Sequence, residues 1–256
     1  MDNLKFYLND VAYDITGKYE VVGNKVVVTI DDLKAGDYTV KVAYADDGVY
    51  GDSENTTSFT VEKADPAIKE IVVNEPIDVG EPLNITVKLP EDATGTITVN
   101  VNGTKYTYDL VNGSVNISIP KLGDGSYPVN ITYSGDDNYD PFTENYTVDV
   151  NKVDPQISAN ASEITLGENA KINVTLPSDA TGTVTIKIEG VDEPITAPVS
   201  GGTNTILIPG VPVGTHSVEI TYNGDSKYAI DTVNTTLSVV PKPTTADESL
   251  DRKSVV

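Results

Sequence analysis

The chain has 256 residues, enough for two to three small domains, and a formal net charge of −22. A phosphate backbone would repel so acidic a chain, so nucleic acid and anionic membrane surfaces are not expected as partners. The absence of cysteine excludes disulfides, thiol catalysis and zinc–thiolate sites. No apolar run is long enough to predict a membrane span or a signal peptide.

One short turn occurs three times at a fixed interval. "YADDGVY" begins at Tyr44, "YSGDDNY" at Tyr133 and "YNGDSKY" at Tyr222, so successive copies lie 89 residues apart. "VEKADPAI" at 61–68 and "VNKVDPQI" at 150–157 keep the same interval. The repetition predicts four segments: a shortened first repeat (1–63), a second repeat (64–151), a third repeat (152–240) and a polar, Pro-containing tail (241–256).

The first repeat contains five runs with strand character: "LKFYL", "KYEVV", "KVVVTI", "YTVKVAY" and "TSFTV". It has no counterpart of "IKEIVV" and "LNITVKL", which open the second repeat. We therefore expect residues 1–63 to form an incomplete, least stable repeat with a bare sheet edge. We also expect that Met1 is not the natural start and that the missing strands lie upstream. The alternative is that a partner donates a strand.

Within the full repeats the apolar residues alternate with period two. In "SYPVNITY", Tyr127, Val129 and Ile131 share one face, and "LNITVKL" and "NYTVDV" follow the same pattern. Gly- and Asn-containing turns separate the runs, which predicts all-β, tandem immunoglobulin-like antiparallel sandwiches. The linkers "EKADP" and "NKVDP" are short and contain Pro66 and Pro155, which favours an elongated rod.

The pattern Gly-x-Tyr-x-Val-x-Ile-x-Tyr-x-Gly-Asp-x-x-Tyr resembles the bacterial-type immunoglobulin-like repeats of microbial surface proteins. Paired with "DATGTITV" at 92–99 and "DATGTVTI" at 179–186, and with many Asn and Thr residues, it is most similar to adhesin-like proteins of methanogenic archaea. The resemblance extends to about Val240. It implies an extracellular location and adhesion or display, with the signal and the anchor outside this sequence.

The repeated heptapeptide is interpreted as the last hairpin of each sandwich. Gly135 and Asp136 supply the residues that such a turn needs. The flanking tyrosines are expected to place their rings on the edge of the core and to keep their hydroxyls in water.

No catalytic or nucleotide-binding motif is present, so an enzyme is not expected, and no catalytic or cofactor-binding residue is assigned. His216, the only histidine, occupies the position held by Tyr38 and Tyr127 in the other repeats. This position resembles the tyrosine corner of immunoglobulin-like folds, which favours a structural role over catalysis.

Two sets of aspartates raise the hypothesis of calcium at the domain junctions. The fold would gather Asp65, Asp92 and Asp136 in the second repeat. It would gather Asp154, Asp179 and Asp225 in the third repeat. The favoured alternative is that each aspartate caps its own turn, so no metal ligand is assigned.

Two kinds of covalent modification are considered. Glycosylation is one, because ten Asn-x-Ser/Thr sequons occur and the outward strand positions suit a sugar. Their asparagines are Asn55, Asn84, Asn102, Asn112, Asn116, Asn130, Asn145, Asn160, Asn173 and Asn234. A self-formed crosslink is the other, but Gln156 is the only glutamine and Lys–Asn candidates are too many to choose between.

These observations predict a non-catalytic cell-surface stalk or adhesin-like repeat region. Its partners would be neighbouring repeats and a surface protein or glycan that the sequence does not name. The alternative is a carbohydrate-binding accessory module of a secreted protein, which needs a row of exposed aromatic rings. Only Tyr139 and Tyr228 are expected to be exposed.

Overall fold

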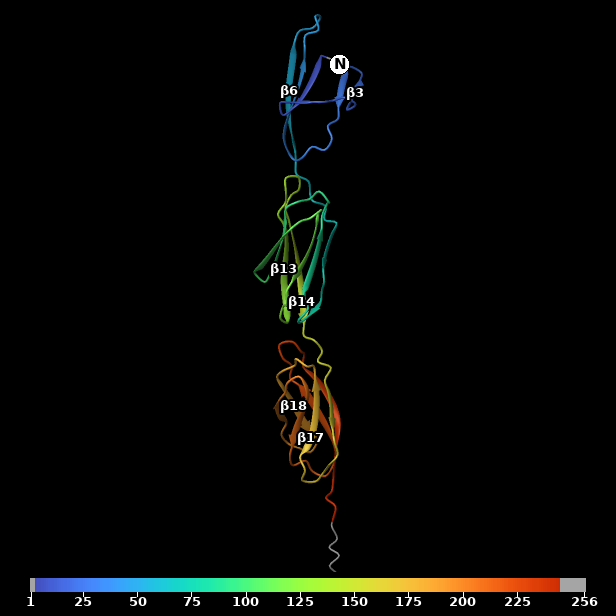
Figure 1. Cartoon of the computed structure of the whole chain (residues 1–256), viewed down its shortest axis with the longest axis vertical. Helices are drawn as coiled ribbons and strands as arrows, with labels where there is room; N and C mark the ends of the chain where they lie inside the picture. Colours follow the sequence, from blue (N-terminus) through green and yellow to red (C-terminus); the bar gives the residue numbers. More distant parts are fainter. Residues whose placement is uncertain (1–2, 245–256) are drawn as a thin grey trace, which may run out of the picture. The chain divides into compact units, whose positions relative to one another are not determined.

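The structure is a computed structural model that describes residues 3–244, so most of the predicted tail lies outside the described residues. Every regular element in this range is a β-strand, and the strands form six sheets (Figure 1). The described residues include no helix that could cross a membrane. The predicted all-β class and the tandem immunoglobulin-like sandwiches are confirmed.

The second repeat is a two-layer sandwich, coloured teal to yellow-green in Figure 1. One layer has the order β12-β9-β7 and the other has the order β11-β10-β13-β14-β8. The alternating residues of β9 explain the layering, because Leu83, Ile85 and Val87 are at most 1% exposed while the residues between them lie outward. The strands are β7 (Glu70–Val73), β8 (Ile77–Asp78), β9 (Leu83–Lys88), β10 (Thr96–Val101), β11 (Thr104–Asp109), β12 (Ser114–Ile119), β13 (Gly125–Tyr133) and β14 (Phe142–Asn151).

The third repeat has the same topology, with layers β15-β17-β20 and β19-β18-β21-β22-β16. Its core is aliphatic apart from two tyrosines, Tyr222 and Tyr228. Ile, Val and Leu therefore fill a core that contains two cysteines and a tryptophan in antibody domains. The strands are β15 (Ser158–Ala161), β16 (Ile164–Thr165), β17 (Ala170–Leu176), β18 (Thr183–Ile188), β19 (Ile195–Pro198), β20 (Gly202–Ile208), β21 (Gly214–Tyr222) and β22 (Asp231–Val240).

The first repeat contains all five strands that its sequence predicts. They form the sheet β2-β1-β5-β6 and the separate hairpin β3-β4. A sixth strand, β2, was not predicted. The strands are β1 (Leu4–Leu8), β2 (Val11–Tyr13), β3 (Tyr19–Val22), β4 (Lys25–Val28), β5 (Gly36–Tyr44) and β6 (Ser53–Val61).

The side chains of the first repeat are less buried than those of the other two. Within residues 3–63 no side chain reaches the buried state that is common in the other repeats. Phe59 is 38% exposed, whereas its counterparts 89 and 178 residues later, Val148 and Leu237, are 0% exposed. The inner face of the first sheet therefore lacks the cover that the other sandwiches have.

Candidate functional site

The repeated heptapeptide joins the last two long strands of each repeat, as predicted: β5 to β6, β13 to β14 and β21 to β22. Gly135 and Gly224 have positive φ values of 70° and 76°. A Cβ at either position would lie 2.9 Å from a backbone oxygen, that of Tyr139 or Tyr228 respectively. The turn therefore requires glycine for its backbone conformation and also for its close packing.

The aspartate of this turn accepts four hydrogen bonds. In the second repeat, Asp136 Oδ1 accepts the backbone N–H groups of Asn138 and Tyr139, both at 2.8 Å. Its Oδ2 accepts the N–H of Thr94 at 2.7 Å and the Thr94 hydroxyl at 2.9 Å. The Asp136 carboxylate therefore closes its own turn and ties it to the segment before β10.

The third repeat reproduces this arrangement. Asp225 Oδ1 accepts the N–H groups of Lys227 and Tyr228, both at 2.7 Å. Asp225 Oδ2 accepts the Thr181 N–H at 2.9 Å and the Thr181 hydroxyl at 3.1 Å. The two motifs that recur together in the sequence, Gly-Asp-x-x-Tyr and Asp-Ala-Thr-Gly, are thus in direct contact. Their joint recurrence in both full repeats was the only sequence signal for this contact.

The closing tyrosine is half-buried in the second repeat (Tyr139) and buried in the third (Tyr228), which corrects the expectation that these two are exposed, whereas Tyr50 of the first repeat is 69% exposed. Tyr228 is 5% exposed and its hydroxyl donates to Asp179 Oδ1 at 2.6 Å. The Tyr139 hydroxyl lies 2.9 Å and 3.1 Å from the two carboxylate oxygens of Asp92. Because each hydroxyl has an acceptor within reach, the ring folds back over the turn and is not available as an exposed platform.

The opening tyrosines also differ from expectation, since their hydroxyls lie inside the fold. Tyr133 and Tyr222 are both 0% exposed. The Tyr222 hydroxyl donates to the Thr181 carbonyl at 2.7 Å. Burial of this side chain raises the pKa of Tyr222 to about 12. Both rings therefore belong to the buried core of their repeats.

Each linker is bound to the last hairpin of the repeat that follows it. At the first junction, the Ala64 N–H donates to the Asn138 carbonyl at 2.8 Å, and the Asp140 N–H donates to the Ala64 carbonyl at 2.9 Å. The Lys63 Nζ donates to the Asp136 carbonyl. The pair Ala64–Tyr139 forms a parallel β-bridge, which the sequence did not predict.

The second junction has the same bonds. Val153 donates its N–H to the Lys227 carbonyl and accepts the N–H of Ala229, both at 2.9 Å. The Lys152 Nζ donates to the Asp225 carbonyl at 2.5 Å. A lysine followed by one residue in extended conformation is therefore the feature that both linkers use to attach to the turn. The recurrence of Lys-x-Asp-Pro was visible in the sequence, but its hairpin partner was not.

The aspartates of the calcium hypothesis are each engaged elsewhere. Asp65 Oδ1 accepts the Ala67 N–H at 3.3 Å, and Asp154 accepts the N–H and the side-chain amide of Gln156 at 2.9 Å and 2.7 Å. Asp179 forms an ion pair with Lys227 at 2.7 Å. Across residues 3–244, no three His, Cys, Asp or Glu side chains come close enough together to hold a metal ion. The alternative in which each aspartate caps its own turn fits Asp65, Asp136, Asp154 and Asp225, whereas Asp92 and Asp179 accept bonds from side chains of the last hairpin.

His216 has the structural position that the sequence predicts. Its ring is 8% exposed, and Nε2 lies 2.8 Å from the Pro212 carbonyl, four residues upstream. Tyr38 makes the corresponding contact, because its hydroxyl donates to the Lys34 carbonyl at 2.9 Å, also four residues upstream. His216 Nδ1 adds a second contact, 2.7 Å from the Glu189 carbonyl. The ring therefore connects the loop before β21 to the turn after β18.

The sequons divide into exposed and paired sites. Asn130 and Asn173 are half-buried, and their side-chain amides donate to Asn145 and Asn160 at 2.5 Å and 3.1 Å. The other eight asparagines are exposed. Asn145 and Asn160 are themselves exposed sequon asparagines. Each of these two exposed sites is therefore hydrogen-bonded to a half-buried sequon asparagine.

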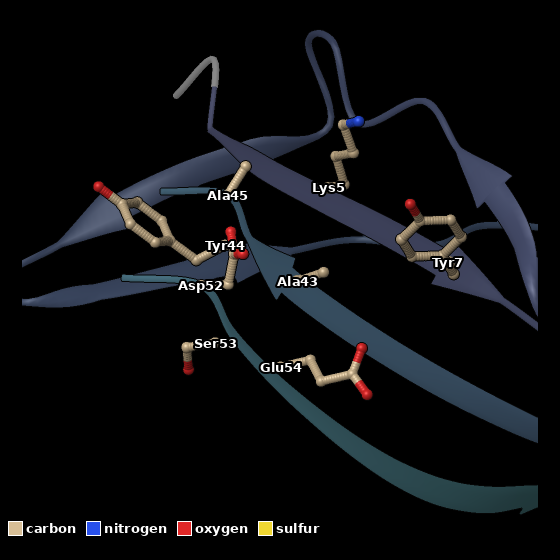
Figure 2. A pocket seen from close by; sticks show the side chains of 8 residues that line it. All are labelled: Lys5, Tyr7, Ala43, Tyr44, Ala45, Asp52, Ser53 and Glu54. Carbon is tan, nitrogen blue, oxygen red and sulfur yellow. The ribbon is translucent and has the colours of Figure 1, made fainter. Parts of the chain in front are cut away.

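A hollow of about 380 Å³ lies on the first repeat, where β1 meets the end of β5 and the start of β6 (Figure 2). Lys5, Tyr7 and Glu54 line it with Ala43 between them. Asp52, at its rim, accepts the Asp46 N–H at 2.7 Å and so caps the hairpin. The hollow is an open surface feature, and its lining shows no nucleophile paired with a base.

Comparison with known proteins gives the family. The model of the bacterial Ig-like domain (group 3) matches residues 71–151 and again residues 157–240. The chain belongs to the bacterial Ig-like domain (group 3) family. Together the two matches cover more than half of the chain and correspond to the second and third repeats. No curated protein matches the chain.

Among solved structures, the chain is similar to the fibronectin(III)-like modules of Clostridium thermocellum CbhA, with 17% identity over 68% of this chain and 94% of that one, at a TM-score of 0.29. It is similar to the titin domains z1z2 solved with telethonin, with 13% identity over 72% and 100% of the two chains, at 0.41. It is also similar to the Bacteroides ovatus protein SGBP-B solved with a mixed-linkage heptasaccharide, with 13% identity over 93% and 60%, at 0.23.

Proposed function

We propose that this bacterial Ig-like chain is a non-catalytic segment of a cell-surface stalk that displays an adhesive region or contributes to adhesion. Its domains are an incomplete repeat at 1–63, complete repeats at 64–151 and 152–240, and a polar tail at 241–256. Modules of this fold usually serve as spacers and attachment surfaces, and function lies in the parts that they carry.

The observation that carries the proposal is that both linkers are hydrogen-bonded to the last hairpin of the next repeat. Ala64 and Val153 each form two backbone hydrogen bonds, in the same register, with the turn of the following repeat. A linker that is held in this way has fewer free backbone angles than its length suggests. A stalk needs such joints, because a chain of freely jointed domains would collapse and would not hold its tip away from the cell.

The proposal includes an extracellular location and sugars on the exposed sequons. The net charge of −22 keeps such a segment soluble and repels it from anionic surfaces. Antibodies against the second repeat should label intact cells, and mild protease treatment of intact cells should remove the label. Labelling only after the cells are broken would contradict the proposal.

A carbohydrate-binding role has less support. The two aromatic rings expected to be exposed, Tyr139 and Tyr228, place their hydroxyls on Asp92 and Asp179. Glycan-array binding by the full chain discriminates between the two roles. Tight, saturable binding that a Tyr139→Ala variant loses would favour the carbohydrate-binding module over the stalk.

A further inference from the structure

The inner face of the first repeat is open. Val26 of β4 is 37% exposed, whereas its counterpart 89 residues later, Val115, is 9% exposed. A hollow of about 360 Å³ lies against this face. Its apolar lining includes Phe6, Leu8, Val28, Ile30, Val40 and Phe59.

In the second repeat, one strand covers the corresponding face. Leu83, Ile85 and Val87 of β9 are 0%, 1% and 0% exposed, and β9 pairs antiparallel with β12. In the third repeat, β17 pairs with β20 in the same position. Among the described residues of the first repeat, β4 has only β3 beside it. One edge of β4 is therefore free among these residues.

Backbone bonds in the second repeat identify the two edges. The Leu89 N–H donates to the Gly113 carbonyl at 2.8 Å, so Gly113 faces the β9 side. Ser114 exchanges both of its backbone bonds with Val111, at 3.0 Å and 3.1 Å, so Ser114 faces the opposite side. Successive residues of a strand direct their N–H and C=O groups to opposite edges. Val115 and Ile117 therefore face β9.

The same rule places β3 on the other side of β4. Lys25 is the counterpart of Ser114 and pairs with Val22 across a two-residue turn. Further along, the Thr29 N–H donates to the Lys18 carbonyl at 2.9 Å. Residues 25 and 29 therefore face β3, and residues 26 and 28 face the edge that β9 occupies in the second repeat. Within residues 3–244 that edge has no strand.

We propose that the first repeat binds an added extended strand of alternating apolar and polar residues, antiparallel to β4 along the free edge of Val26 and Val28. The register follows from the second repeat, in which Leu83 is opposite Ile119, Ile85 opposite Ile117 and Val87 opposite Val115. Three apolar donor residues at alternate positions therefore lie opposite Ile30, Val28 and Val26. The residues between them are polar and face solvent, as Asn84 and Thr86 do.

This donor combines two sources of binding energy. The backbone groups of Val26 and Val28 gain hydrogen-bond partners, and the apolar face of the first sheet loses contact with water. A strand with this alternation is chemically distinct from a flexible polar segment, and a shift by one residue would turn its apolar side chains outward. The site therefore selects a donor strand by the alternation of its apolar residues and by its register. A donor that is only apolar would not bind.

The test adds a synthetic peptide with the sequence of residues 82–90, "PLNITVKLP", to the intact chain. At ten times the dissociation constant, amide exchange should slow about tenfold in β4 and β5. Exchange in residues 83–240 should not change. A control peptide with Ser at the three inward positions should have no effect. Slowing by both peptides, or by neither, would overturn the proposal.

Two matched variants locate the site. Val28→Asp places a carboxylate on the inner face, whereas Val27→Asp places it on the outer face of the same strand, where Val27 is already 42% exposed. Only Val28→Asp should abolish the peptide effect. If exchange in the peptide-free chain is already as slow in residues 4–61 as in the third repeat, or if the chain forms a dimer that buries this face, the site is not vacant and the proposal fails.

Discussion

Asp136 connects the turn after β13 to the segment before β10, because its Oδ2 accepts both the N–H and the hydroxyl of Thr94. Thr94 precedes β10 and Asp136 follows β13, and these two strands are neighbours in the sheet. The contact thus fixes the open end of a strand pair at a point where the ladder of backbone bonds stops.

Asp136→Asn should lower the free energy of unfolding of the second repeat by about 1–3 kcal/mol. The amide NH₂ cannot accept the two Thr94 bonds, so a donor is left without a partner. Urea unfolding followed by residue-resolved hydrogen exchange measures the loss. Asp137→Asn is the matched control, because Asp137 is adjacent in sequence and exposed. An equal loss in both variants would mean that charge removal alone, and not the hydrogen bonds, causes the effect.

The lowered pKa of the Asp136 carboxylate predicts that the second repeat loses stability in acid. Burial raises the pKa of Asp136, but hydrogen bonds from Thr94, Asn138 and Tyr139 outweigh it and hold the pKa at about 2, below the ordinary 3.8. A lowered pKa in the folded state means that the stabilisation is complete above the ordinary pKa and is lost as the pH falls through the folded one. The difference in stability between the native chain and Asp136→Asn should therefore shrink between about pH 5 and pH 2. A difference that stays constant over this range would contradict the assignment.

The two opening tyrosines should respond differently to loss of the hydroxyl. Tyr222→Phe removes the 2.7 Å bond to the Thr181 carbonyl and should cost about 0.5–1.5 kcal/mol. In residues 3–244 the buried Tyr133 hydroxyl has no hydrogen-bond partner, so Tyr133→Phe should be neutral or slightly stabilising. Denaturant midpoints of the two variants check this. A larger loss for Tyr133→Phe would show that its hydroxyl has a partner.

His216 should tolerate tyrosine better than phenylalanine. His216→Phe leaves the carbonyls of Pro212 and Glu189 without their ring partner and should cost about 1–3 kcal/mol. His216→Tyr can retain the Pro212 contact, as Tyr38 does with Lys34. Thermal unfolding of the third repeat should rank native above Tyr above Phe. Equal stability of the two variants would contradict the view that the polar contact of residue 216 with the Pro212 carbonyl stabilises the loop.

The sequence predicts the strands well and the contacts between motifs poorly. Alternation in "LNITVKL" determines which side chains are buried, since each inward residue has to leave water. Nothing local in "EKADP" shows that Ala64 will form a β-bridge with Tyr139, because that pairing depends on a hairpin more than seventy positions later. The tyrosines show a related limit. Their ring and hydroxyl favour different surroundings, so the strand phase alone could not tell that Tyr133 and Tyr222 would be fully enclosed.

Small-angle X-ray scattering of the intact chain tests the stalk most directly. The proposed stalk requires the three repeats, each about 35–40 Å long, to be joined end to end, which should give a maximum dimension above about 100 Å. Substituting Lys63 and Lys152 by Ala removes the lysine side-chain contacts to the hairpins and leaves the backbone bonds of Ala64 and Val153, and it should broaden the distance distribution. A radius of gyration near about 18 Å, as expected for a globule of this length, would contradict the account.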